Sequence, residues 1–116
     1  MLLLPIDFLK HIREEAAFIT AQTGDMSLGD LENNLVLQRA LEKSLEIVGE
    51  ATKRLDTVFC KKYPHIDWKA MVGIRYKLVH DYFDVDLELM YNICKANIPD
   101  LLIEIDKIID TEENAN

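Results

Sequence analysis

The sequence is poor in residues that interrupt regular structure and in residues that cross-link a chain. Its 116 residues include four glycines, three prolines and two cysteines. Cys60 and Cys94 form no Cys-x-x-Cys pair and no Cys/His cluster, which argues against a disulfide scaffold or a zinc site. We therefore expect two free thiols, a reducing cytoplasmic environment and no bound metal.

Long apolar runs are also missing. No stretch reaches the roughly 18–20 apolar residues that span a bilayer. The apolar start "MLLLPI" meets Pro5 and Asp7 at once and lacks a basic segment and a cleavage site, so it does not resemble a signal peptide. With 49% apolar and 29% charged residues, the chain is predicted to be one globular domain over residues 1–116, with 111–116 as a frayed polar tail.

Positive charge is scarce overall but gathered in one block. The net charge is −8, made up of −5 over residues 1–50, +5 over residues 51–80 and −8 over residues 81–116. A negative chain argues against general affinity for nucleic acid, and we expect no DNA partner. The basic block ends at "RYKLVH", although a solvated face explains a block this modest equally well.

Alternation of apolar and polar residues, the pattern of an exposed strand, is absent, and this favours an all-α fold. Gly49 falls inside one expected helix, where it costs about 1 kcal/mol relative to Ala, so we expect a close helix–helix crossing there. The short loops predict a compact antiparallel bundle of four to five helices. The expected helices span Ile6–Thr20, Leu31–Phe59, Trp68–Phe83, a segment from the candidate caps Asp84 and Asp86 to Lys95, and Pro99–Asp110.

The stretch Gly73–Asp86 carries an arginine, a histidine and a tyrosine close together. On a helix, Arg75 and Tyr82 share a face because they lie seven residues apart, whereas His80 lies about 140° from Arg75 and roughly 7.5 Å along the axis. Tyr76 and His80 are neighbours at four residues. Taken singly, each has an ordinary explanation: a histidine bonded to a backbone carbonyl, an arginine in a surface ion pair, or an aromatic ring at the edge of the core.

Taken together, the three residues fit a known pattern. "RYKLVHDY" resembles the Arg-x4-His-x-Tyr motif of HepT-like proteins, a branch of the HEPN superfamily. "LQRALEKSLEIVGEATKRL" (residues 37–55) resembles the long second helix of that family, with its Gly-Glu-Ala signature. Residues 66–102 resemble its tryptophan-containing approach to the motif, the acidic turn that follows, and the final helix with its Pro-Asp-Leu start.

The resemblance implies a HEPN-like helical bundle that forms a homodimer and acts as a ribonuclease toxin on RNA, either tRNA or mRNA. It further implies a nucleotidyltransferase antitoxin that uses ATP to transfer AMP onto the motif tyrosine, with no cofactor in this chain. By position, Arg75 and His80 would be catalytic and Tyr82 would be modified. The residues expected to support the site are Tyr76, Lys77 and Asp81.

This chemistry is physically reasonable. RNA cleavage without a metal needs a base for the 2′-hydroxyl proton, an acid for the leaving 5′-oxygen and a cation beside the phosphorane. Histidine serves as acid or base near neutral pH, and the forked guanidinium of arginine suits a phosphate. One chain supplies one motif histidine, so we expect a composite site across a two-fold dimer. His11 and His65 are expected at the surface, away from the site.

One position departs from the family, which usually has a small polar residue, often Asn, after the motif arginine. Here it is Tyr76, expected to orient His80 or stack on it. The acidic segment from Asp81 to Glu88 would repel RNA unless it faces away or docks a basic partner. Two alternatives stay open: a non-catalytic dimer that binds the nucleotidyltransferase or a nucleotide, and a structural bundle whose motif only packs.

Overall fold

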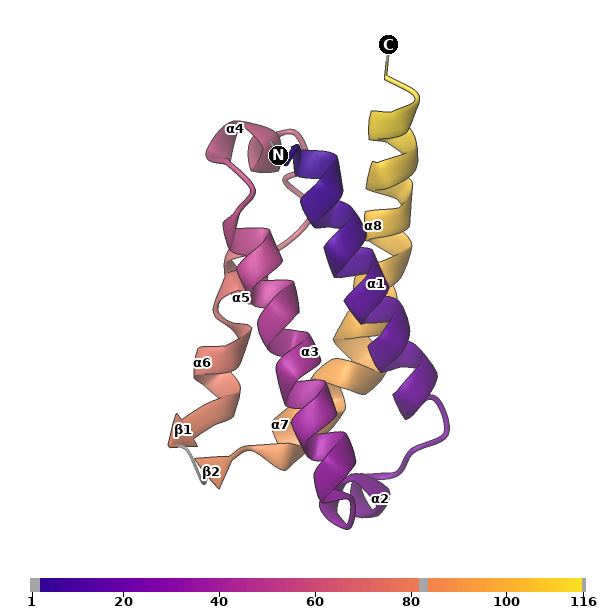
Figure 1. Ribbon diagram of the computed structural model, residues 1–116, viewed down its shortest axis with the longest axis vertical. Helices are drawn as coiled ribbons and strands as arrows, with labels where there is room; N and C mark the ends of the chain where they lie inside the picture. The colour runs from indigo at the N-terminus through magenta and orange to yellow at the C-terminus, as the bar shows by residue number, and fades with distance from the viewer. Residues whose placement is uncertain (1–2, 82–83, 116) are drawn as a thin grey trace.

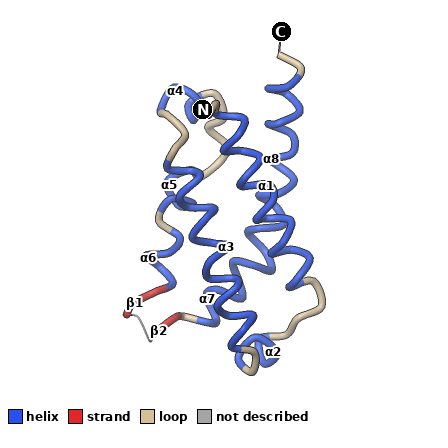
Figure 2. Tube along the Cα trace, viewed as in Figure 1, coloured by secondary structure: helices blue, strands red, loops and turns tan. Residues whose placement is uncertain are grey.

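Three long helical segments form the body of the protein (Figure 1). The computed structural model describes residues 3–81 and 84–115. Helix α1 (Pro5–Thr23) packs along both α3 (Leu35–Lys53) and α8 (Ile98–Glu113). Figure 2 shows helix along most of the chain and two short strands at one end of the molecule. The prediction of an all-α bundle is confirmed.

Short elements fill the connections, and aspartate side chains start several of them. Asp56, Asp67 and Asp86 accept hydrogen bonds from backbone N–H groups three residues later, at 2.7–3.0 Å. These N–H groups have no partner inside their own helix, so the caps decide where the helices begin. The short elements are α2 (Leu28–Glu32), α4 (Thr57–Lys61), α5 (Trp68–Val72), α6 (Ile74–Leu78), β1 (Val79–Asp81), β2 (Asp84–Val85), α7 (Leu87–Asn92) and the π-helical η1 (Ile93–Asn97).

The helix predicted over Leu31–Phe59 is interrupted twice, so that prediction is wrong in its bounds. The Asn34 side chain accepts a hydrogen bond from the Leu37 N–H at 3.0 Å and starts α3 afresh after α2. Helix α3 ends at Lys53, and the Asp56 cap then starts α4. Local caps thus interrupt a helix that apolar periodicity alone would continue.

The two helices predicted after Asp84 are joined instead of separated. Elements α7, η1 and α8 form one helical run from Leu87 to Glu113. Pro99 lies in the first turn of α8 and has no N–H to donate. The π-helical turn Ile93–Asn97 comes just before α8. The helix therefore passes the proline with a local irregularity instead of ending there. The final helix also passes the predicted end at Asp110, which makes the first part of the expected frayed tail helical.

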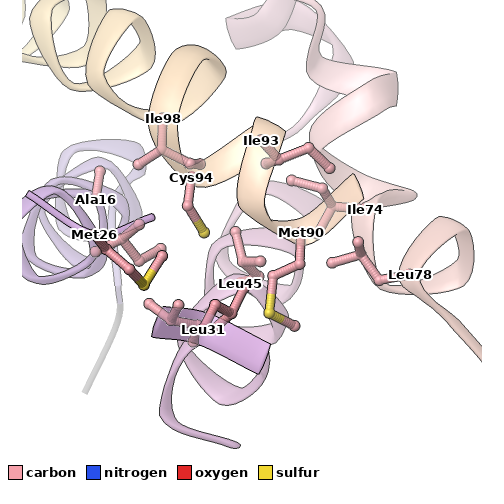
Figure 3. Close-up of a cluster of buried hydrophobic side chains, with 12 residues drawn as sticks. Ala16, Met26, Leu31, Leu45, Ile74, Leu78, Met90, Ile93, Cys94 and Ile98 are labelled. Atoms are coloured by element: carbon pink, nitrogen blue, oxygen red, sulfur yellow. The ribbon is translucent and has the colours of Figure 1, made fainter. Parts of the chain in front are cut away.

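The buried side chains form two clusters along the bundle. One lies around α7 and η1, where Leu45, Met90 and Cys94 meet (Figure 3). The other lies around the opposite end, where Leu9 of α1, Val48 of α3 and Ile105 of α8 are fully buried. Within the described part of the chain, no helix is both long enough and apolar enough to cross a membrane.

Helix α5 approaches α3 closely at Gly49, as the sequence predicts. A Cβ atom at Gly49 would lie 3.2 Å from the carbonyl oxygen of Met71 and 3.4 Å from that of Val72. Both neighbours are backbone atoms, so no side-chain rotation can relieve the contact. The absence of a side chain at Gly49 therefore sets how closely α5, and the α6–β1 segment that follows it, can dock on α3.

A larger residue at this crossing should destabilise the fold. We expect Gly49→Val to lower the free energy of unfolding by about 1–3 kcal/mol, because overpacking a tight contact costs that much. Urea denaturation followed by circular dichroism measures the change. Gly24→Ala is the matched control: a Cβ there meets only Thr20 O at 3.6 Å and the backbone is already helical, so stability should stay equal or rise. Equal stability of Gly49→Val and wild type would contradict the close crossing.

A polar cluster ties α8 to the loop after α4. The Tyr63 hydroxyl and the Lys62 Nζ, the latter at 2.8 Å, both donate to the Glu112 carboxylate. Burial, followed by the hydrogen bond to Glu112, raises the pKa of Tyr63 to about 12. The hydrogen bonds from Lys62 and Tyr63 hold the pKa of Glu112 below its usual value. These contacts stabilise the last turn of α8, which ends at Glu113.

The effect of Tyr63→Phe on stability should depend on pH in a bell-shaped way. At pH 7 we expect the variant to lose about 1 kcal/mol, the typical worth of one such hydrogen bond. The lowered pKa of Glu112 means its contribution is present above about pH 4.5 and is lost as pH falls. The raised pKa of Tyr63 means its contribution is complete below pH 10 and is lost as pH rises toward 12. The difference between wild type and variant should therefore shrink on both sides.

Thermal unfolding of both proteins across pH 3–11 is the measurement. Tyr91→Phe is the control, because the Tyr91 hydroxyl donates to the backbone carbonyl of Met26 at 3.2 Å and not to a carboxylate. Its stability difference from wild type should not shrink as the solution is acidified through the titration of Glu112. A pH-independent difference for Tyr63→Phe would contradict the proposed coupling.

Candidate functional site

The motif segment changes conformation in the middle. Helix α6 ends at Leu78, and Val79 is already extended, with φ −107° and ψ 102°. The Leu78 carbonyl accepts a hydrogen bond from the Asp86 N–H at 2.8 Å, and β1 pairs antiparallel with β2. The predicted continuous helix Trp68–Phe83 is therefore wrong, since it is interrupted at Gly73 and ends before His80.

Arg75 lies on α6 and projects toward α3. Its side chain is about half exposed, and its Nη1 lies 4.0 Å from Oε1 of Glu46. The second oxygen of Glu46 lies 3.9 Å from Nζ of Lys43, so one carboxylate serves two cations. Exposed ion pairs at this distance contribute little energy. The pair orients the guanidinium loosely and leaves donors available for an anion such as phosphate.

His80 lies on β1 with an exposed side chain, next to the exposed Asp81. This exposure excludes the ordinary explanation of His80 as a buried histidine bonded to a backbone carbonyl. Because β1 is extended, His80 is not the helical neighbour of Tyr76, and the expected orienting contact loses its geometric basis. Tyr82 falls outside the residues that the structure describes, so its position relative to Arg75 stays a prediction.

The two remaining supporting residues lie on α6. Lys77 lines a groove between α5–α6 and η1–α8, and Tyr76 is exposed on the outer side of the helix. Structure thus places Arg75, Tyr76 and Lys77 on one short helix and His80 and Asp81 on the strand after it. The assignment of roles to these five residues stays a prediction.

The groove beside Lys77 has a volume of about 520 Å³. Apolar side chains including Met71, Ile74 and Ile93 form much of its lining. The sequence analysis missed it because its walls come from α5, α6, η1 and α8, which are distant along the chain. How far apart these elements pack is a tertiary property that no local pattern in the sequence reveals.

Other reactive groups are poorly placed for catalysis. Burial raises the pKa of the Cys94 thiol to about 12, and burial followed by the nearby Asp56 raises that of Cys60. Both are free thiols, as predicted, and neither has the lowered pKa of a nucleophilic cysteine. His11 and His65 are exposed, also as predicted, and His65 pairs with Glu104 at 3.3 Å. Across residues 3–81 and 84–115, no three His, Cys, Asp or Glu side chains gather as metal ligands.

The fold and the motif segment together define a class: an all-α bundle that presents an exposed arginine and an exposed histidine five residues apart. Residues 12–108 match the family model described as HepT-like, "Ribonuclease HepT-like". The chain belongs to this family, and the resemblance seen in its sequence is confirmed.

Curated relatives agree with this membership. The chain is 35% identical over 109 residues to "Putative RNase TTE0752" of Caldanaerobacter subterraneus subsp. tengcongensis, covering 94% of this chain and 97% of the relative. It is 33% identical over 102 residues to "Probable ribonuclease HepT" of Thermococcus cleftensis, covering 88% and 93% of the two chains. No solved structure matches the chain. The family to which the chain belongs is thus one whose model and curated members are described as ribonucleases of the HepT type.

Proposed function

We propose that the protein is a ribonuclease toxin that cleaves RNA at a site shared by two copies, with Arg75 and His80 as its catalytic residues. The observation that carries the proposal is their joint exposure in one short segment of a chain from this family. An exposed imidazole can exchange protons with a substrate, and an exposed guanidinium can reach a phosphate.

The proposed reaction is a transesterification. The 2′-oxygen of the ribose attacks the adjacent phosphorus, and the bond between phosphorus and the 5′-oxygen breaks. One His80 removes the proton of the 2′-hydroxyl, and a second histidine donates a proton to the leaving 5′-oxygen. Arg75 binds the non-bridging oxygens, where negative charge increases in the transition state. Two copies supply the two histidines, which is why the site is proposed to be composite.

Substitution at the two motif residues tests the proposal. We expect His80→Ala to slow cleavage of tRNA or mRNA by about 10²–10⁴-fold, the usual contribution of a general acid or base. Arg75→Ala should slow it by about 10²–10³-fold, as loss of a charge-stabilising donor does. The matched controls His11→Ala and Arg39→Ala change exposed residues outside the segment and should cleave like wild type.

Gel electrophoresis of labelled RNA incubated with purified protein measures the rates, and growth after induction of each variant gives the cellular readout. Wild type should arrest growth without its partner, and either motif substitution should relieve the arrest. Wild-type protein that leaves both RNAs intact and growth unaffected would contradict the ribonuclease proposal.

That negative result would favour the second candidate function, a non-catalytic dimer that is modified by, or binds, a nucleotidyltransferase. One observation favours this alternative: Asp81, Asp84 and Glu88 are exposed on and just after the hairpin that carries His80. Three carboxylates beside the site oppose the approach of a polyanion. They suit a basic protein surface better.

The proposed control mechanism is transfer of AMP from ATP to Tyr82 by a minimal nucleotidyltransferase antitoxin. Its support is the Arg-x4-His-x-Tyr pattern, which places Tyr82 two residues after His80. An AMP group there would add negative charge and bulk close to the site, and so oppose RNA binding.

Mass spectrometry after co-expression with the nucleotidyltransferase tests this mechanism. The expected result is a mass increase of one AMP, or a whole multiple, on the peptide that contains Tyr82. Tyr82→Phe should abolish the increase, while Tyr76→Phe, at the other tyrosine of the Gly73–Asp86 stretch, should retain it. Modification of a different residue, or none, would refute the assignment of Tyr82.

A further inference from the structure

Tyr76 is the most exposed of the large apolar side chains in the described chain, at 84%. Its exposure follows from the geometry of α6. Ile74 and Leu78, four residues apart, both enter the core, and with about 100° per residue Tyr76 points to the opposite side of the helix. Helix α6 is therefore a ridge whose outermost point is an aromatic ring in contact with water.

The 520 Å³ groove runs along one flank of this ridge. Ile74 and Lys77 of α6 form one wall, and η1 and α8 form the other. Its lining is mainly apolar, with Met71 and Ile93 nearly buried at its base. A ridge with an aromatic ring beside an apolar groove can fit an identical surface, since a two-fold axis places each ridge opposite the other groove.

The charges of the two surfaces are complementary. The carboxylates of Asp67, Asp100 and Glu104 line the groove, together with Lys77 and with His65, which pairs with Glu104. The ridge next to Tyr76 carries Arg75, and helix α6 has no acidic residue. An arginine on the ridge therefore meets a groove in which carboxylates outnumber basic side chains, which orients docking and opposes the reverse arrangement. The hydroxyl of a buried tyrosine also needs a polar partner, and the carboxylates and Asn97 at the groove can supply one.

We propose that Tyr76 of one copy inserts into the groove between α5–α6 and η1–α8 of a second copy, and that the second copy does the same in return. The contact rests on the proposed function in one respect: it places the two α6–β1 segments side by side, as a composite site requires. It makes Tyr76 the anchor of the dimer, consistent with the frequent role of tyrosine at the centre of interfaces.

Sedimentation equilibrium over a concentration series tests the contact. Wild type should be a dimer, and Tyr76→Ala should weaken dimerisation by about 30-fold or more, the effect of removing an interface hot spot. Tyr76→Phe keeps the ring and should retain most of the affinity. Val36→Ala is the matched control, because Val36 is 80% exposed at the start of α3 and does not line the groove; it should dimerise like wild type.

The groove is tested separately from the ridge. Asp100→Lys reverses a charge at an exposed edge position and should weaken the dimer, while the isolated fold stays intact by circular dichroism. Mixing a Tyr76→Cys chain with an Asn97→Cys chain under oxidising conditions should give a disulfide-linked heterodimer, and the two parent chains alone should not. A dimer that tolerates both Tyr76→Ala and Asp100→Lys, or a wild-type monomer at all concentrations, would overturn the inference.

The experiment separates this inference from the proposed ribonuclease. If Tyr76→Ala leaves the dimer unchanged while His80 is still needed for cleavage, the anchor is wrong and the ribonuclease stands. If Tyr76→Ala dissociates the dimer but wild type cuts no RNA, the anchor stands and the ribonuclease is wrong.

Discussion

The position of the motif segment depends on the contact between α3 and α5 at Gly49. Carbonyl oxygens of Met71 and Val72 lie where any side chain at this position would press against them. Helix α5 is only five residues long, and a helix this short is stabilised mainly by packing against its neighbours, here α3. Glu46, nearly one turn earlier on α3, then reaches Arg75 on the next short helix. The absence of a side chain at Gly49 thus lets α5 pack close to α3, and α6, which carries Arg75, follows directly after α5.

Much of the fold follows from short-range patterns in the sequence. The apolar spacing of α1, the caps Asp67 and Asp86, and the crossing at Gly49 are all predicted correctly. The breaks within the predicted Leu31–Phe59 helix are not predicted, because apolar periodicity continues from α2 through α3 to α4, and each short helix packs on one of the two clusters that α3 also joins. A change of exposure, from the buried Leu31 to the exposed Leu35, identifies the first break only when the structure is known.

The candidate site is predicted less completely, and the reason is nonlocal. The sequence identifies Arg75 and His80 as a pair but places them on one helix. The Leu78 carbonyl instead accepts a hydrogen bond from the Asp86 N–H, eight residues away, and the following residues pair as strands. No local sequence pattern predicts a hydrogen bond between residues so far apart along the chain. The ordinary explanation of Arg75 as a surface ion pair is also correct, since it contacts Glu46, and it is compatible with a catalytic role because the pair is weak.

The extended strand strengthens the case for a shared site. A residue adds about 1.5 Å along a helix but roughly 3.3 Å along a strand. The two residues from Leu78 to His80 therefore carry the imidazole beyond the end of α6, while Arg75 stays on the flank toward α3. One chain therefore holds the proposed proton-transfer group and the proposed phosphate-binding group on different elements. A second copy, related by two-fold symmetry along the α6 ridge, is the simplest source of a nearer partner for each.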